Sequence, residues 1–136
     1  MPAPKVYIVI LNYKQWQDSR DCLESVLRSG YDNFSVLLVD NNSQNHSLEN
    51  LIQWLENSKN AYAGISLKSR VSYTLFKKDE LNDSIELTRL PQITFIQNDS
   101  NVGFGAGNNI ALRFLQHQDA YVWLLNPDME IGRAHV

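Results

Sequence analysis

Four short polar segments in this chain each follow an apolar run, and their oxygen-rich side chains could bind a metal ion or a phosphorylated ligand. These segments are Asn12-Tyr13, residues 40–43 (Asp-Asn-Asn-Ser), Asn98-Asp99 and residues 126–128 (Asn-Pro-Asp). None of them contains a lysine or arginine, although Lys14 directly follows the first. A diphosphate would therefore need a divalent cation, which prefers carboxylate oxygens as ligands. Asp128 is the natural candidate for such a ligand.

The apolar runs in front of these segments predict a parallel sheet. We expect β-strands at residues 6–11, 34–39, 93–96 and 121–125. Amphipathic patterns predict helices at residues 15–29 and 47–57, and a third that begins around 105–107. Strands that alternate with helices indicate an α/β fold in which helices cover both faces of a parallel sheet. The carboxyl ends of all its strands, and thus the four polar segments, would share one edge.

An insert of about residues 58–90 interrupts this alternation. Residues 71–76 could form a strand within a small hairpin, and residues 77–80 and 82–84 have the composition of exposed turns. We therefore expect a surface excursion. A contact with an acceptor or a partner is the alternative, and no particular residue supports it.

The segment 101–109 is rich in glycine and precedes the third predicted helix. Its backbone N–H groups could face an anion, or the glycines could instead allow close packing of helix on sheet. The dinucleotide-binding fingerprint expects its glycines after the first strand of the unit, whereas here they follow the third. A dinucleotide-dependent oxidoreductase is therefore a poor fit, and no phosphate-loop motif is present.

The composition excludes several classes of function. The chain has 136 residues and a formal net charge of −3, which argues against a nucleic-acid partner. It contains neither an apolar run long enough for a transmembrane helix nor a secretory signal. Its single cysteine, Cys22, cannot form an internal disulfide, and its three histidines do not have the spacing of a zinc site.

Taken in order, four motifs resemble the N-terminal half of family 2 inverting glycosyltransferases with the GT-A fold, and most closely the rhamnosyltransferase-like branch. The motifs are residues 9–13 (Val-Ile-Leu-Asn-Tyr), 38–43 (Leu-Val-Asp-Asn-Asn-Ser), 101–109 and 124–128 (Leu-Leu-Asn-Pro-Asp). The resemblance implies a Rossmann-like nucleotide-sugar-binding half that is cut off after the fourth core strand. It covers most of residues 5–130 except the insert. We accordingly expect residues 1–130 to be the donor-binding part of a glycosyltransferase domain.

The resemblance also implies roles for the matching residues. Asp40 would hydrogen-bond the base or ribose of the donor, and Asp128 would bind Mg²⁺ or Mn²⁺ that bridges the donor diphosphate. Asn126 replaces the first aspartate of the family's Asp-X-Asp element, a variant that is familiar in the rhamnosyltransferase-like branch. The complete set expected to bind the donor nucleotide is Leu11, Asn12, Tyr13, Asp40, Asn42, Asn101, Gly103, Asn109 and Asn126.

The implied parent enzyme transfers a sugar, with rhamnose as the expected one, from a dTDP or UDP donor. Its acceptor would be a saccharide or a lipid-linked molecule in cell-surface polysaccharide synthesis. It would work in the cytoplasm, in solution or peripherally at the inner face of the membrane. The alternative is a non-catalytic nucleotide-binding or interaction module.

The family's catalytic base and most of its acceptor site come from a later segment, so we assign no catalytic residue and expect the fragment alone to be inactive. Residues 131–136 (Ile-Gly-Arg-Ala-His-Val) match a translated reading frame of a common sequencing adapter. We therefore expect a non-native tail. The apolar fourth strand would then be an open edge, which predicts poor solubility or partial unfolding.

Overall fold

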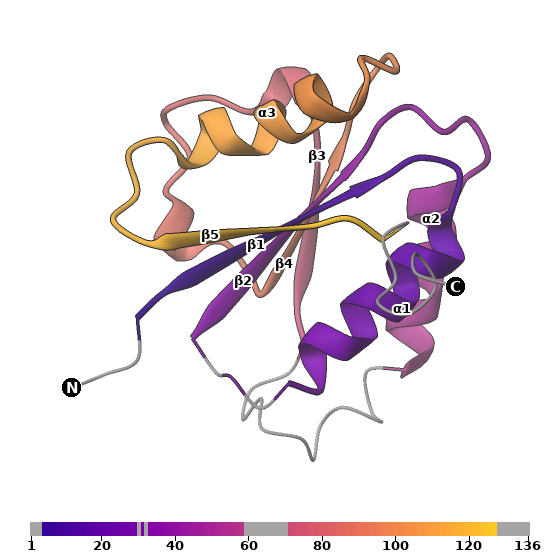
Figure 1. Cartoon of the computed structure of the whole chain (residues 1–136), viewed down its shortest axis with the longest axis horizontal. Helices are drawn as coiled ribbons and strands as arrows, with labels where there is room; N and C mark the ends of the chain where they lie inside the picture. The colour runs from indigo at the N-terminus through magenta and orange to yellow at the C-terminus, as the bar shows by residue number, and fades with distance from the viewer. Residues whose placement is uncertain (1–3, 30, 32, 59–70, 128–136) are drawn as a thin grey trace, which may run out of the picture.

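The computed structural model of the chain describes residues 4–29, 31, 33–58 and 71–127, which form an α/β unit (Figure 1). The strands and helices alternate along most of the chain, as predicted. In chain order, the elements are β1 (Val6–Asn12), α1 (Trp16–Leu27), β2 (Phe34–Asp40), α2 (Ser47–Ser58), β3 (Tyr73–Lys77), the short 3₁₀ helices η2 (Lys78–Glu80) and η3 (Leu87–Arg89), β4 (Ile93–Gln97), α3 (Phe104–Leu115) and β5 (Tyr121–Leu125).

The five strands form one parallel sheet in the order β3-β4-β2-β1-β5. The central strands β2 and β1 pair along their whole length, from Val6 with Phe34 to Asn12 with Asp40. Each is an almost continuous apolar run, as expected for a strand that is covered on both faces. This confirms the predicted α/β fold with a parallel sheet.

The strand predicted within residues 71–76 of the insert is present as β3, but it joins the main sheet, so the prediction of a surface excursion with a small hairpin was wrong. β3 pairs in parallel with β4, from Tyr73 with Ile93 to Lys77 with Gln97. The Tyr73 ring meets the buried Phe95 ring edge to face, with 5.9 Å between the centroids. Leu75 and Lys77 of β3 are exposed and its other residues are half-buried, as suits an edge strand. Residues 59–70 of the insert lie outside the described residues.

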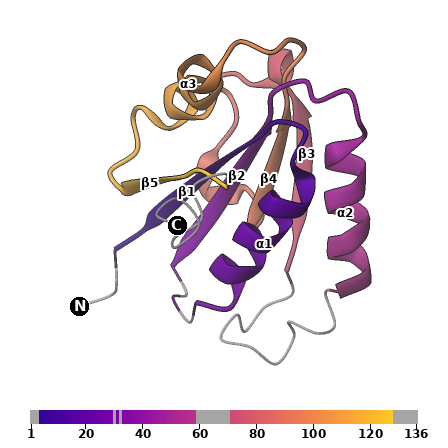
Figure 2. The same ribbon diagram turned by 45° about the vertical axis from the view of Figure 1, so that its right-hand side comes forward.

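Helices cover both faces of the sheet and divide the core into two clusters (Figure 2). On one face, α1 and α2 bury Leu23, Leu27, Leu51 and Leu55 against strand residues such as Phe95. On the other face, α3 and the segment after β3 pack on a smaller cluster. The buried members of that cluster are Tyr7, Val9, Leu11, Leu37, Val39, Ile96, Ala111 and Leu115.

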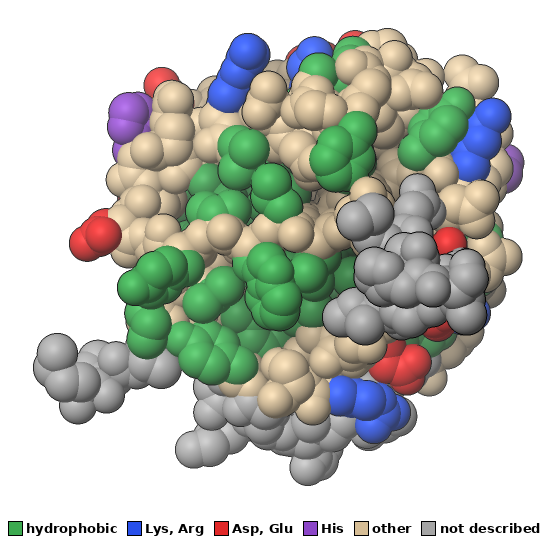
Figure 3. Space-filling view, viewed as in Figure 1, with side chains coloured by type: hydrophobic (Ala, Val, Ile, Leu, Met, Phe, Trp, Pro, Cys, Tyr) green, Lys and Arg blue, Asp and Glu red, His purple; other side chains and the backbone are tan. Residues whose placement is uncertain are grey.

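β5 is the outer strand beside β1, and most of its apolar surface is open. Tyr121 is 66% exposed and Trp123 58%, while Val122 and Leu124 on the opposite face are 39% and 46% exposed. Figure 3 shows apolar side chains gathered across this side of the molecule. The four residues Tyr121, Val122, Trp123 and Leu124 are called the β5 patch below.

Candidate functional site

The carboxyl edge of the sheet contains a crevice between β2 and β4. After β2 the chain passes to α2 on one face of the sheet, whereas after the neighbouring β4 it passes to α3 on the other face. Loops that diverge in this way leave a space between them, and this is where open α/β sheets bind ligands.

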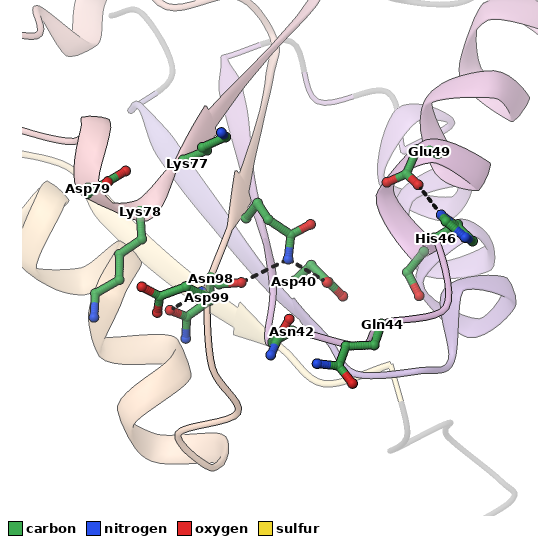
Figure 4. Close-up of a pocket in the computed structure, with 12 residues that line it drawn as sticks. Asp40, Asn42, Gln44, His46, Glu49, Lys77, Lys78, Asp79, Asn98 and Asp99 are labelled. Atoms are coloured by element: carbon green, nitrogen blue, oxygen red, sulfur yellow. Dashed lines mark hydrogen bonds and ion pairs between the residues drawn. The ribbon is translucent and has the colours of Figure 1, made fainter.

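A cleft of about 520 Å³ occupies this position (Figure 4). Residues from the ends of β2, β3 and β4 and from the start of α2 line it. They are Asp40, Asn42, Gln44, His46, Ser47, Glu49, Lys77, Lys78, Asp79, Gln97, Asn98 and Asp99. We refer to this space as the strand-end cleft.

Asp40 is the buried centre of a hydrogen-bond network at the base of the strand-end cleft. Its Oδ1 accepts from Asn12 Nδ2 at 2.8 Å and from Ser43 Oγ at 2.6 Å. Its Oδ2 accepts from the Ser43 backbone N–H at 3.1 Å and from Gln97 Nε2 at 2.9 Å. A carboxylate has about four acceptor positions, so these bonds use its capacity and fix the turn after β2.

Asn12 joins the end of β1 to the same network. In addition to its bond to Asp40, its Nδ2 lies 3.3 Å from Ser43 Oγ, and its Oδ1 accepts from Ser19 Oγ of α1 at 2.6 Å. Its side chain is 1% exposed. These hydrogen bonds connect β1, α1 and the turn after β2, so the Asn12 amide stabilises the arrangement of these elements at the site.

Asn41 connects the turn after β2 to the glycine-rich segment, and sequence reasoning gave it no role. Its Nδ2 donates to Asn101 Oδ1 at 2.9 Å and to the Gly103 carbonyl at 3.2 Å. Its Oδ1 accepts from Asn98 Nδ2 and from the Val102 backbone N–H. The only signal in the sequence was its position between Asp40 and Asn42, in a turn already predicted to lie at the site.

The glycines of the segment 101–109 have different environments. Gly103 caps α3 with φ +86°, a left-handed conformation that favours glycine, and its surroundings are open. A Cβ on Gly105 would meet nothing within 4 Å. A Cβ on Gly107 would lie 2.9 Å from Leu11 Cδ1 and 3.3 Å from Asn41 Nδ2. Gly107 is therefore a packing glycine, whereas Gly103 and Gly105 leave backbone accessible.

The other predicted site residues are spread along the same edge. Asn42 lines the strand-end cleft in a left-handed conformation with φ 60°, and Leu11 is buried beneath Gly107. Tyr13 is 39% exposed after β1, and Asn109 is exposed on α3. Thus Asp40 and Asn42 share the cleft, while Asn101 and Gly103 are joined to its framework through Asn41.

The end of β5 lies on the far side of β1 from the strand-end cleft. Asn126 lines a second, mainly apolar hollow of about 700 Å³ between α1, β1 and β5, together with Cys22 and Trp123. Burial raises the pKa of the Cys22 thiol to about 11, which keeps it protonated near neutral pH. Asp128, the predicted metal ligand, lies outside the described residues, and among the described ones no three His, Cys, Asp or Glu are grouped to hold a metal ion.

The strand-end cleft contains basic residues that the four predicted segments lacked. Lys77 at the end of β3 and Lys78 at the start of η2 both line it (Figure 4). The prediction missed them because they belong to the insert, whose strand was not expected to join the sheet.

Comparison with known proteins supports one family. Residues 7–70 match the model of glycosyl transferase family 2, a stretch that contains most of β1 and all of α1, β2 and α2. The glycine-rich segment and residues 126–128 lie outside the match. A five-stranded parallel sheet with helices on both faces is consistent with the Rossmann-like GT-A fold. No curated protein matches the chain.

The described residues include the helices α1, α2 and α3, each of 12 residues. None of them is both long enough and apolar enough to cross a membrane.

Proposed function

We propose that this chain is the donor-binding part of a family 2 glycosyltransferase, and that a nucleoside-diphosphate sugar binds along the carboxyl edge of its sheet. The observation that carries the proposal is the network around Asp40 and Asn41. It joins the ends of β1, β2 and β4 and the glycine-rich segment into one framework beside a cleft. The match of residues 7–70 to glycosyl transferase family 2 supports a nucleotide sugar as the ligand of that framework.

The proposed donor carries dTDP or UDP, with rhamnose as the sugar. The nucleoside lies toward the strand-end cleft, and the diphosphate extends past β1 toward the end of β5, which Asp128 follows in the sequence. Leu11, Tyr13, Asn109 and Asn126 would border this path, while Asn12 and Asp40 hold the loops that form it. The acceptor is a saccharide or lipid-linked molecule of cell-surface polysaccharide synthesis, and the work takes place at the cytoplasmic side.

Bound Mg²⁺ or Mn²⁺ would stabilise the negative charge of the departing nucleoside diphosphate, and Asp128 is the residue proposed to hold it. Attack by the acceptor hydroxyl on the anomeric carbon also needs a general base. No residue of this chain is assigned that role, so the proposal concerns donor binding.

Calorimetric titration tests the proposal. UDP, dTDP and NAD are titrated into the protein with and without Mn²⁺. We expect UDP or dTDP to bind more tightly with Mn²⁺, and the Asp128→Ala variant to lose this metal dependence. Asp119→Ala, which removes a carboxylate from the opposite end of β5, is the matched control and should retain it. Metal-independent binding would favour a non-catalytic nucleotide-binding module, and a preference for NAD would contradict the proposal.

A further inference from the structure

The segments that follow β3 and β4 bring a lysine and a carboxylate, Lys78 and Asp99, to the same cleft. Lys77 pairs with Gln97 at the last register position of β3 and β4, after which Lys78 begins η2 and Asp99 lies two residues beyond Gln97 in the loop after β4. Both side chains are exposed and both line the strand-end cleft, as Figure 4 shows. Within the described part of the chain, neither makes a side-chain hydrogen bond or ion pair. The pair is therefore free to bind a ligand.

The polar groups deeper in the cleft already have hydrogen-bond partners within the protein. Asp40 accepts four internal hydrogen bonds, and Asn41 donates two and accepts two. The Asn98 amide donates to Asn41 and accepts from the Asp99 backbone N–H. A ligand in the strand-end cleft would consequently find its free hydrogen-bond partners at the mouth.

Lys78 and Asp99 differ in what they offer. The ammonium group of lysine only donates hydrogen bonds, and an ionised carboxylate only accepts them. Uracil, thymine and guanine each carry a keto oxygen, which accepts, next to a ring N–H, which donates. Cytosine and adenine have an amino group in place of that oxygen, and this group would oppose the ammonium group with a second donor.

We infer that Lys78 and Asp99 select the base of the nucleotide: Lys78 donates to the keto oxygen and Asp99 accepts from the ring N–H. The inference rests on the proposed function, since it names the base for which the donor site is specific. The insert would thus determine specificity through the strand that it adds to the sheet. The expected donors carry uracil, thymine or guanine.

The test measures dissociation constants for UDP, dTDP, GDP, CDP and ADP in the presence of Mn²⁺. The unaltered protein should bind the three keto bases roughly tenfold more tightly than CDP and ADP. Lys78→Gln and Asp99→Asn should each reduce this preference severalfold, whereas Lys78→Arg, which keeps the donor, should retain it. Arg89→Gln is the matched control: it removes one positive charge from the same insert, at an exposed residue that does not line the cleft.

Three results would overturn the inference. Equal affinity for all five nucleotides would refute base selection and leave nucleotide binding intact. If Lys78→Gln weakens all five nucleotides equally, and inorganic pyrophosphate with them, then the lysine contacts phosphate instead. If no nucleotide binds to the unaltered protein, the proposed function itself fails.

Discussion

At the scale of single residues, Asp40 accepts the hydrogen bonds that hold together the strand ends and the turn of the site. The resemblance to family 2 glycosyltransferases implied a direct bond from Asp40 to the base or ribose, and a carboxylate at a strand end suits either a ligand or a turn. In the structure its oxygens are occupied by Asn12, Ser43 and Gln97. The residue type is the same in both roles, so only the positions of its neighbours along the folded chain could distinguish them.

This role predicts a loss of stability when the carboxylate is removed. Asp40→Ala would leave the buried donors of Asn12 and Ser43 without their acceptor, and each unsatisfied buried group costs about 1–3 kcal/mol. We expect the free energy of unfolding, measured by urea denaturation, to fall by roughly 3 kcal/mol. Asp83→Ala, in an exposed turn, should change it by less than about 0.5 kcal/mol. Equal stability of the two variants would show that the network does not hold the turn.

At the scale of elements, the sequence predicted the alternation of strands and helices because each element has its own apolar period. The order of the strands could not be predicted in the same way. β3 follows a long stretch of insert, and its five residues contain nothing that identifies β4 as its partner. The pairing of Tyr73 with Ile93 is a tertiary contact, and without it Lys77 and Lys78 could not be placed at the site.

The packing of α3 against the sheet gives a paired prediction. Gly107→Ala would push a methyl group against Leu11 and Asn41 and should destabilise the protein by about 1–3 kcal/mol. Gly105→Ala, two residues earlier, meets open space and should stabilise it by about 0.4–1 kcal/mol, since alanine restricts the unfolded chain.

Thermal unfolding of the two variants, followed by circular dichroism, decides between packing and backbone flexibility. If both raise the melting temperature, then the contact at Gly107 does not restrain the helix. If both lower it, then the conformational freedom of glycine matters at this helix start, and the proposed difference between the two positions is wrong.

At the scale of the whole molecule, the β5 patch is the surface at which we most expect the protein to associate with other copies of itself. β5 is an edge strand without a charged residue or a proline, the devices by which edge strands avoid pairing with other chains. Both its faces are apolar and exposed. β3, the opposite edge, ends in Lys77 and is followed by Lys78, so the two edges differ in this protection.

We therefore expect concentration-dependent self-association, or low solubility, that depends on β5. Trp123→Lys should increase the monomer fraction in analytical ultracentrifugation, because it places a charge in the centre of the exposed strand. Leu75→Lys, at a 48% exposed position of β3, should have a much smaller effect. A stable monomer with a sharp, cooperative melting transition in the unaltered protein would contradict this expectation.

We have proposed that a nucleoside diphosphate binds at the carboxyl edge of the sheet, with its nucleoside between β2 and β4. The most direct measurement is a titration of the ¹⁵N-labelled protein with UDP or dTDP and Mg²⁺, followed through the backbone amide signals. We expect the largest shifts in residues 40–43 and 97–103. Shifts confined to the apolar hollow between α1 and β5, or none at saturating nucleotide, would contradict the proposal.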